Sequence, residues 1–352
     1  MSVHTRPIRE RIDWLMDLSR RHSEAYCDPE NALARRRYLA EHDTRIVVMK
    51  CMDGRVHFPN ATRTPLGVIR SFRNLGGIFD LGWPYLGDML ADAVEDAVAA
   101  GRRVLIMISY HYSRGEPSRG CAGFNCDRNA AIAHCHQIRD QVERTFGSRH
   151  QTVYPLVCGF ETDDDALILH GESGERLDLA AVADTQTDSL TSHIESLYPE
   201  MPAEVRRDLL PLLEGNVRHV RALRGVDRAL DIEHREWAIC VGRGFDFLRE
   251  PNVGLIIGPY SPDLSHPIGK AAGIIRQNME QGRIPDDGLL LLTTAPYDRE
   301  GPDRARAVIK AGFLAQFAAE VITREQPELA RGMQTRVTTL HWPSRRLAPV
   351  DQ

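Results

Sequence analysis

The sequence contains cysteine and histidine residues whose order could place them around one metal ion. Cys51 follows a short apolar run, His111 ends another, and Cys121 and Cys126 come soon after His111. Two thiolates and one imidazole suit tetrahedral Zn²⁺, with bonds of ~2.3 Å to sulfur and ~2.0–2.1 Å to nitrogen. Three protein ligands leave the fourth position open, which is typical of a catalytic rather than a structural zinc.

Either Cys121 or Cys126 could supply the second thiolate. Ala122 and Gly123 follow Cys121, and such small residues permit a close approach of the backbone to a metal. Cys126 stands directly before Asp127, where we expect a helix to begin. The sequence therefore favours Cys121, with Cys126 as the alternative.

Two charged residues accompany Cys51 in a C-x-D-x-R motif. Asp53 beside the guanidinium of Arg55 is expected to stay ionised, and the planar fork of Arg55 can hold the carboxylate at two points. Such a carboxylate can accept a hydrogen bond from a zinc-bound water, whose pKa falls toward ~7. We predict that Asp53 and Arg55 are catalytic. The alternative is a turn with a surface ion pair of little energetic value.

The elements that would position these residues follow from hydrophobic patterning. Alternating strands and helices predict an α/β fold with a largely parallel sheet, where loops at the carboxyl ends of the strands converge. Segments 165–170 and 175–179 flank a Gly-Glu-Ser-Gly turn and predict a hairpin. We expect strands at 45–49, 67–70, 104–108 and 152–160, and helices at 88–100 and 127–146.

The second half of the chain resembles the first. Further strands are expected at 237–241, 253–257 and 289–293, with helices at 266–281 and 302–323. The segment from Cys51 can be aligned with that from Cys240, and Tyr112 with Tyr297. The intervals are 112 − 51 = 61 and 297 − 240 = 57 residues. This similarity indicates an internal duplication.

The predicted organisation has four parts. They are an N-terminal helical arm (1–40), a catalytic zinc-binding domain (41–183), a helical connector (184–232) and a degenerate second domain without metal (233–352).

Composition narrows the function classes. The chain has 352 residues and a formal net charge of −5, so no basic excess favours nucleic acid or an anionic membrane. The longest apolar runs are too short to cross a bilayer. No signal peptide is visible, and the seven unevenly spaced cysteines indicate reduced thiols rather than a disulfide framework. We therefore expect a cytoplasmic protein.

The motifs resemble those of β-class carbonic anhydrases over roughly residues 45 to 160. That class carries C-x-D-x-R after its first strand and a strand ending in His with a Cys soon after. The segments Arg73-Asn-Leu-Gly-Gly77 and Cys121-Ala-Gly123 also look like parts of the family pattern. The resemblance implies two β-carbonic-anhydrase-like domains, the second degenerate. It also implies reversible hydration of CO₂ to bicarbonate, with zinc on Cys51, His111 and Cys121.

One departure points to a subgroup. Nine residues (112–120) separate His111 from Cys121, where the family usually has two. This longer loop, the duplication and the segment 159–166 look like the carboxysome shell carbonic anhydrase, whose second domain has lost its zinc. Here Gly242 stands opposite Asp53 and Pro296 opposite His111, so the resemblance implies one Zn²⁺ per chain, with Cys240 as the remnant of a lost second site.

Several alternatives remain open at this stage. The same fold could hydrolyse CS₂ or COS, or the chain could be a scaffold with a vestigial site. A homodimer is possible. Carboxysome components are possible partners, but the short N-terminal region does not indicate them, so the carboxysome is the alternative location. His57 could shuttle protons, although a surface or structural role is favoured, and the His134-Cys-His136 segment is not expected to bind metal because its side chains point apart on a helix.

Overall fold

The computed structural model describes residues 2–147, 152–184 and 190–350. The chain divides into two compact units. The first-sheet unit comprises Leu33–Cys51 and Val56–Ile232, and the second-sheet unit comprises Met1–Ala32, Met52–Arg55 and Glu233–Gln352. The four-part organisation expected from sequence stays a prediction, and residues 185–189 of the expected connector lie outside the described residues.

The first-sheet unit is built on a six-stranded sheet with the order β2-β1-β3-β4-β5-β6. The neighbours among β2, β1, β3 and β4 pair in parallel, whereas β5 and β6 are antiparallel additions, which confirms the expected hairpin. The strands are β1 (Arg45–Cys51), β2 (Ile69–Asn74), β3 (Val104–Tyr112), β4 (Val153–Glu161), β5 (Ala166–His170) and β6 (Arg176–Asp178).

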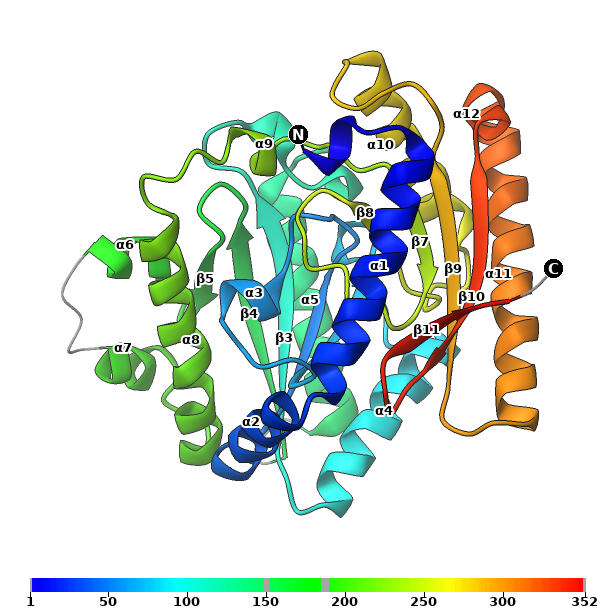
Figure 1. Cartoon of the computed structure of the whole chain (residues 1–352). Coiled ribbons are helices and arrows are strands. Elements are labelled where there is room, and N and C mark those ends of the chain that lie inside the picture. Colours follow the sequence, from blue (N-terminus) through cyan, green and yellow to red (C-terminus); the bar gives the residue numbers. More distant parts are fainter. Residues whose placement is uncertain (1, 148–151, 185–189, 351–352) are drawn as a thin grey trace. The chain divides into compact units, whose positions relative to one another are not determined.

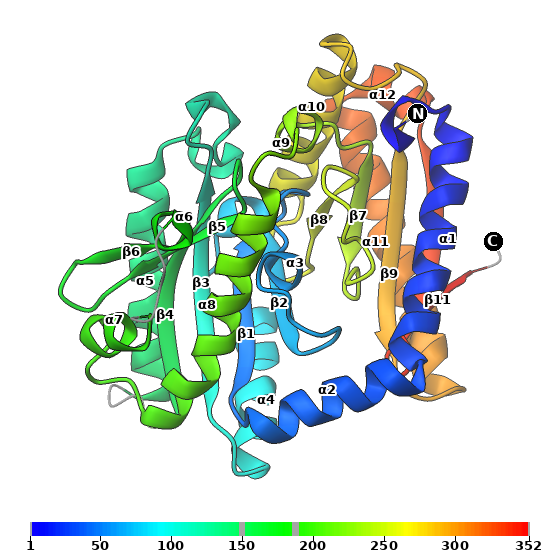
Figure 2. The same ribbon diagram turned by 60° about the vertical axis from the view of Figure 1, so that its left-hand side comes forward.

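Helices cover both faces of this sheet. α5 (Arg128–Phe146) lies against β3 and β4, while α8 (Ala203–Leu223) packs on the other face over Val48, Met107 and Leu156. Figure 2 shows α8 in front of these strands and α5 behind them. The other helices that lie wholly or mainly in this unit are α2 (Pro29–Glu41), α3 (Phe58–Ala61), α4 (Pro84–Ala99), α6 (Leu179–Asp184), α7 (Leu190–Leu197) and α9 (Ala229–Ile232).

The second-sheet unit contains a five-stranded sheet with the order β8-β7-β9-β10-β11. Its first four strands pair in parallel and β11 is antiparallel. The strands are β7 (Ala238–Gly242), β8 (Gly254–Ile257), β9 (Leu290–Tyr297), β10 (Gln334–His341) and β11 (Arg346–Pro349). The helices are α1 (Ile8–Cys27), α10 (Ser265–Glu280), α11 (Pro302–Glu325) and α12 (Pro327–Arg331).

The N-terminal helix α1 is anchored to this second unit. Figure 1 shows it crossing in front of the second sheet, with α11 behind. Its Arg11 is fully buried and forms an ion pair with Asp287, whose carboxylate also accepts the backbone N–H of Ile8 at 2.7 Å. The guanidinium lies 5.3 Å from the centre of the Trp237 ring. Arg11 therefore contributes a buried ion pair and a cation–π contact to the unit.

The predicted fold class is confirmed, because the chain forms an α/β structure with two mostly parallel sheets. The sequence did not predict β10 and β11. The first of these has few aliphatic residues and buries the polar Thr338 and Thr339, so no apolar run marks it. The Thr338 hydroxyl instead donates to the carbonyl of Thr293 at 2.7 Å, which satisfies it inside the sheet.

The expected correspondence between Cys240 and Cys51 does not hold within the strands. Cys51 is the last residue of β1 and pairs with Asn74, the last residue of β2. Cys240 lies in the middle of β7, two residues before its end at Gly242, and is fully buried. Cys240 is therefore an interior strand residue and not a ligand at the carboxyl end of the sheet.

Candidate metal centre

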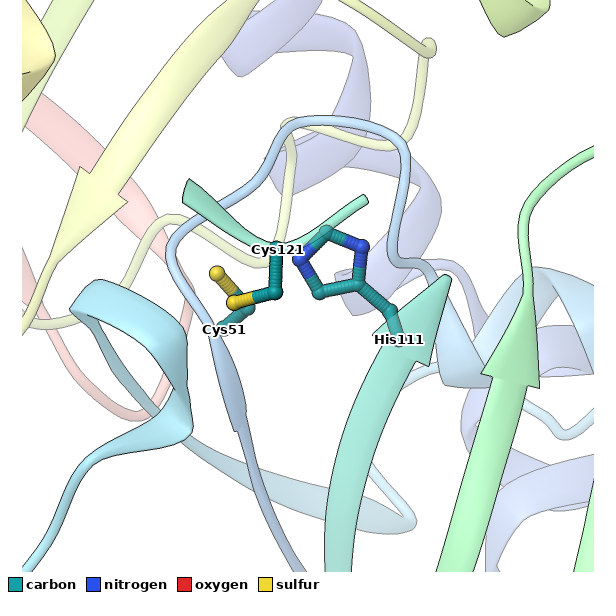
Figure 3. Close-up of side chains that lie close together, drawn as sticks. All are labelled: Cys51, His111 and Cys121. Carbon is teal, nitrogen blue, oxygen red and sulfur yellow. The ribbon is translucent and has the colours of Figure 1, made fainter. Parts of the chain in front are cut away.

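The structure brings together the three candidate metal ligands that the sequence favoured. Cys51 ends β1, His111 is the penultimate residue of β3, and Cys121 directly precedes the short 3₁₀ helix η4 (Ala122–Phe124). One ligand atom from each lies within 4.8 Å of the others, and all three residues are buried. Figure 3 shows the two sulfur atoms next to one another with the imidazole beside them.

This arrangement fits the geometry that Zn²⁺ requires. Tetrahedral bonds of ~2.3 Å to sulfur and ~2.0–2.1 Å to nitrogen place neighbouring ligand atoms roughly 3.5–3.8 Å apart. The limit of 4.8 Å found here for the atoms of Cys51, His111 and Cys121 is compatible with that spacing. The donor set is also soft, which favours zinc over magnesium or calcium.

A glycine turn positions both cysteines. The 3₁₀ turn η2 (Leu75–Gly77) has positive φ values of 68° at Gly76 and 67° at Gly77, which favour glycine. A Cβ on Gly77 would lie 3.5 Å from the backbone nitrogen of Cys51, and one on Gly123 would lie only 2.6 Å from Cα of Gly76. The small residues after Cys121 thus permit close contact with this turn.

Cys126 does not join the ligand group. It is half-buried, and its Sγ lies 3.4 Å from the carbonyl oxygen of Ser118. Its φ of 64° is unusual for a residue with a side chain. Its backbone N–H donates to the carbonyl of Cys121 at 2.9 Å, which closes the short loop behind that residue.

Asp53 and Arg55 form a buried ion pair within the second-sheet unit. Oδ1 of Asp53 accepts the backbone N–H of Arg55 at 2.8 Å and its Nε–H at 3.0 Å, and Oδ2 accepts from Nη2 at 2.7 Å. The two residues are only 4% and 3% exposed. The alternative of a weak surface pair is therefore wrong, because burial removes the solvent screening that weakens such pairs.

Two residues that the sequence did not single out support this pair. Nε2 of His234 lies 2.9 Å from Nη2 of Arg55, and its Nδ1 lies 3.1 Å from each carboxylate oxygen of Glu236. A carboxylate can only accept, so Nδ1 carries a proton that it donates to Glu236. His234 therefore lies between the guanidinium of Arg55 and the carboxylate of Glu236.

Glu236 is fully buried, which by itself disfavours its charged form. Charge attraction and hydrogen bonding from His234, together with the charge of Arg55, outweigh burial and hold the pKa of Glu236 below its usual value. The amide of Asn278 also contacts the Glu236 backbone carbonyl at 3.1 Å. Only their position before β7, in a His-x-Glu sequence, could have drawn attention to His234 and Glu236.

Residues 34–196 match the family described as the catalytic domain of the carboxysome shell carbonic anhydrase. The matched segment contains Cys51, His111 and Cys121, as well as Asp53 and Arg55, and ends before His234. A search of curated proteins finds no match.

The family match confirms the resemblance and the expectation of an enzyme, since this is a family of carbonic anhydrases. The other histidines that the sequence offered for a role at the candidate metal centre do not join the ligand group. His57 is buried rather than at the surface, and Nε2 of His134 accepts the backbone N–H of Phe79 at 3.3 Å. Within the described ranges, no candidate metal-binding group includes His134 or His136. No helix among these residues is long and apolar enough to span a membrane.

Proposed function

We propose that this chain is a zinc-dependent carbonic anhydrase that interconverts CO₂ and bicarbonate, with one Zn²⁺ held by Cys51, His111 and Cys121. The observation that carries the proposal is the grouping of these three side chains within 4.8 Å inside the segment that matches the carbonic anhydrase family. Three ligands leave a fourth position for solvent, as catalytic zinc requires.

When bound, the metal lowers the pKa of a coordinated water toward ~7, a value typical of carbonic anhydrase zinc sites, and so supplies the nucleophile for CO₂. The chain supplies orientation. Asp53 stands two residues after the ligand Cys51, and its carboxylate is fixed by three hydrogen bonds from Arg55. We infer that, with the metal bound, the Asp53 carboxylate would accept a hydrogen bond from the solvent held there and so would orient that solvent for reaction.

Arg55 is itself held in place. Its Nη2 donates to Asp53 and lies 2.9 Å from Nε2 of His234, whose Nδ1 is in turn held by Glu236. Each of the two carboxylates contacts a basic side chain, Asp53 with Arg55 and Glu236 with His234. We propose that His234 and Glu236 are positioning residues that keep the guanidinium, and through it Asp53, in one orientation during turnover.

The two sheets support an internal duplication. Reading from β2 and β8, the strand orders β2-β1-β3-β4-β5 and β8-β7-β9-β10-β11 match strand for strand, including the antiparallel last strand. Of the residues that the structure describes, the other potential ligand group is Asp53, His234 and Glu236. Arg55 occupies the free nitrogen of that imidazole, so we expect no metal there and a stoichiometry of one zinc per chain.

The family description favours the carboxysome over the cytoplasm as the place of action, and CO₂ and bicarbonate as the small-molecule partners. Co-sedimentation of the tagged protein with isolated carboxysomes, compared with its fraction in the cleared cytosol, checks the location. Size-exclusion chromatography with light scattering checks whether it forms the dimer that the sequence leaves open.

The direct test combines zinc analysis with stopped-flow CO₂ hydration. The wild-type chain should contain one zinc and hydrate CO₂, and Cys51→Ala should lose both. Cys135→Ala, which removes a buried thiol outside the ligand group, is the matched control and should lose neither. Hydration that survives Cys51→Ala and chelation would refute the mechanism. Sulfide release from CS₂ or COS without CO₂ hydration would indicate the alternative substrate, and folded protein without zinc would indicate a scaffold.

A further inference from the structure

The loop of nine residues that joins His111 to Cys121 is held by two carboxylates from a neighbouring turn. The loop covers residues 112–120 and leaves the sheet at the end of β3. The turn follows β4, the parallel neighbour of β3, and contains Glu161, Asp163 and Asp164. The backbone N–H of Thr162 donates to the carbonyl of Tyr112 at 2.9 Å, so the turn and the loop start side by side.

Glu161 is the inner of the two carboxylates. It is fully buried at the end of β4, and Oε1 accepts the backbone N–H of Arg114 in the loop at 2.8 Å. The same oxygen accepts the N–H of Asp163 at 3.2 Å, while Oε2 accepts that of Asp164 at 2.9 Å. Glu161 thereby joins the loop to its own turn.

Asp163 is the outer carboxylate and accepts hydrogen bonds from the same loop. The hydroxyl of Ser113 lies 2.8 and 2.9 Å from its two oxygens, and the N–H of Gly115 donates to Oδ2 at 2.7 Å. Nη2 of Arg119 lies 3.9 Å from Oδ1. The turn is itself held by Arg228, which donates to the carbonyl oxygen of Asp163 at 2.6 Å.

These contacts hold the part of the loop that directly follows the candidate ligand His111. Consecutive N–H groups of a tight loop need acceptors, and ionised carboxylates are stronger acceptors than water or neutral groups. A nine-residue loop without such contacts would sample many conformations, and ordering it costs about 1–2 kcal/mol per residue. That cost would fall on metal binding, because Cys121 must be placed within a few tenths of an ångström.

We propose that Glu161 and Asp163 are positioning residues that pre-order the His111–Cys121 loop, and so set how tightly Cys121 holds the metal. The proposal rests on the proposed zinc site, because it concerns the third ligand of that site. It assigns a role to the acidic turn, whose residues take no part in the ligand group itself.

The test is zinc affinity in Asp163→Ala, measured by competition with a chromophoric chelator. Asp164→Ala is the matched control, because it removes the same charge from the same turn at an exposed side chain. Asp163→Asn keeps one acceptor oxygen and should fall between the two. Glu161→Gln probes the inner carboxylate, and urea unfolding of the metal-free proteins shows whether each variant is folded.

We expect Asp163→Ala to bind zinc about 10- to 100-fold more weakly than Asp164→Ala, in the range found for lost supporting contacts around metal ligands. The Co²⁺-substituted Asp163→Ala protein should also show weaker thiolate-to-metal absorption, because Cys121 is less firmly held. A folded Asp163→Ala or Glu161→Gln with the affinity and spectrum of Asp164→Ala overturns the inference. If the wild-type chain binds no zinc, the proposed function fails instead, so the two failures are distinguishable.

Discussion

The contact between the glycine turn and the Cys121 loop allows a sharp test of how the metal site is built. In Gly123→Ala, the new Cβ would lie 2.6 Å from Cα and 2.8 Å from the nitrogen of Gly76. Carbon atoms in contact prefer about 3.5–4.0 Å, so the loop must move back by roughly 1 Å. Metal-site distances tolerate only about 0.2 Å, and that movement therefore displaces Cys121 from its place in the ligand group.

The expected magnitude follows from the cost of overpacking. Forcing an extra methyl group into a closely packed contact costs about 1–3 kcal/mol. The metal-free protein can relieve this strain by moving the loop, whereas the zinc-bound form cannot, so most of the cost appears in metal binding. A loss of 1.4 kcal/mol is a factor of ten, and we expect zinc affinity to fall roughly 5- to 150-fold.

The assay compares chelator competition with urea unfolding of metal-free and zinc-loaded protein. Gly123→Ala should show weaker zinc binding and a smaller stabilisation by zinc. The control is Gly273→Ala in α10, where a Cβ meets nothing within 4 Å and the change favours the helix. Unaltered zinc affinity in a folded Gly123→Ala protein would refute the reasoning that the glycine contact places Cys121.

Three further predictions follow from the described contacts. Cys121→Ser should abolish stoichiometric zinc binding, whereas Cys126→Ser should keep it, as metal analysis of the two purified variants would show. His234→Ala should lower kcat for CO₂ hydration about tenfold with zinc content unchanged, because Arg55 loses a side chain that holds its guanidinium in place, and an unchanged kcat would contradict the positioning role. Burial, and then the nearby positive groups, lower the pKa of His170 from 6.5 to about 4 in the folded protein. Between these two values the unfolded chain takes up a proton on this residue and the folded protein does not. The contribution of His170 to stability is therefore present above pH 6.5 and is lost as the pH falls toward 4. At pH 5 this loss is about 2 kcal/mol in the free energy of unfolding. In urea titrations, wild type should therefore lose about 2 kcal/mol more than His170→Gln between pH 7 and pH 5.

The sequence alone singled out the three side chains that the structure brings together as a candidate metal-binding group. Cys51, His111 and Cys121 could be predicted because buried strands are marked by local apolar runs, and parallel strands bring their carboxyl ends to one edge of a sheet. The α/β class and most elements follow for the same reason. The preference for Cys121 over Cys126 rested on two small neighbours, and those neighbours are where the loop meets the glycine turn.

Only the tertiary structure showed what supports the ligands. His234 and Glu236 are about 180 residues from Arg55 along the chain, and no local pattern relates them, because a hydrogen bond depends on distance and direction in space rather than on sequence spacing. The strand β10 was missed because its buried hydroxyls find partners across the sheet. The predicted correspondence of Cys240 with Cys51 was wrong for a similar reason. The sequence does not tell a cysteine in the middle of a strand from one at its end, because strand pairing decides where the strand stops.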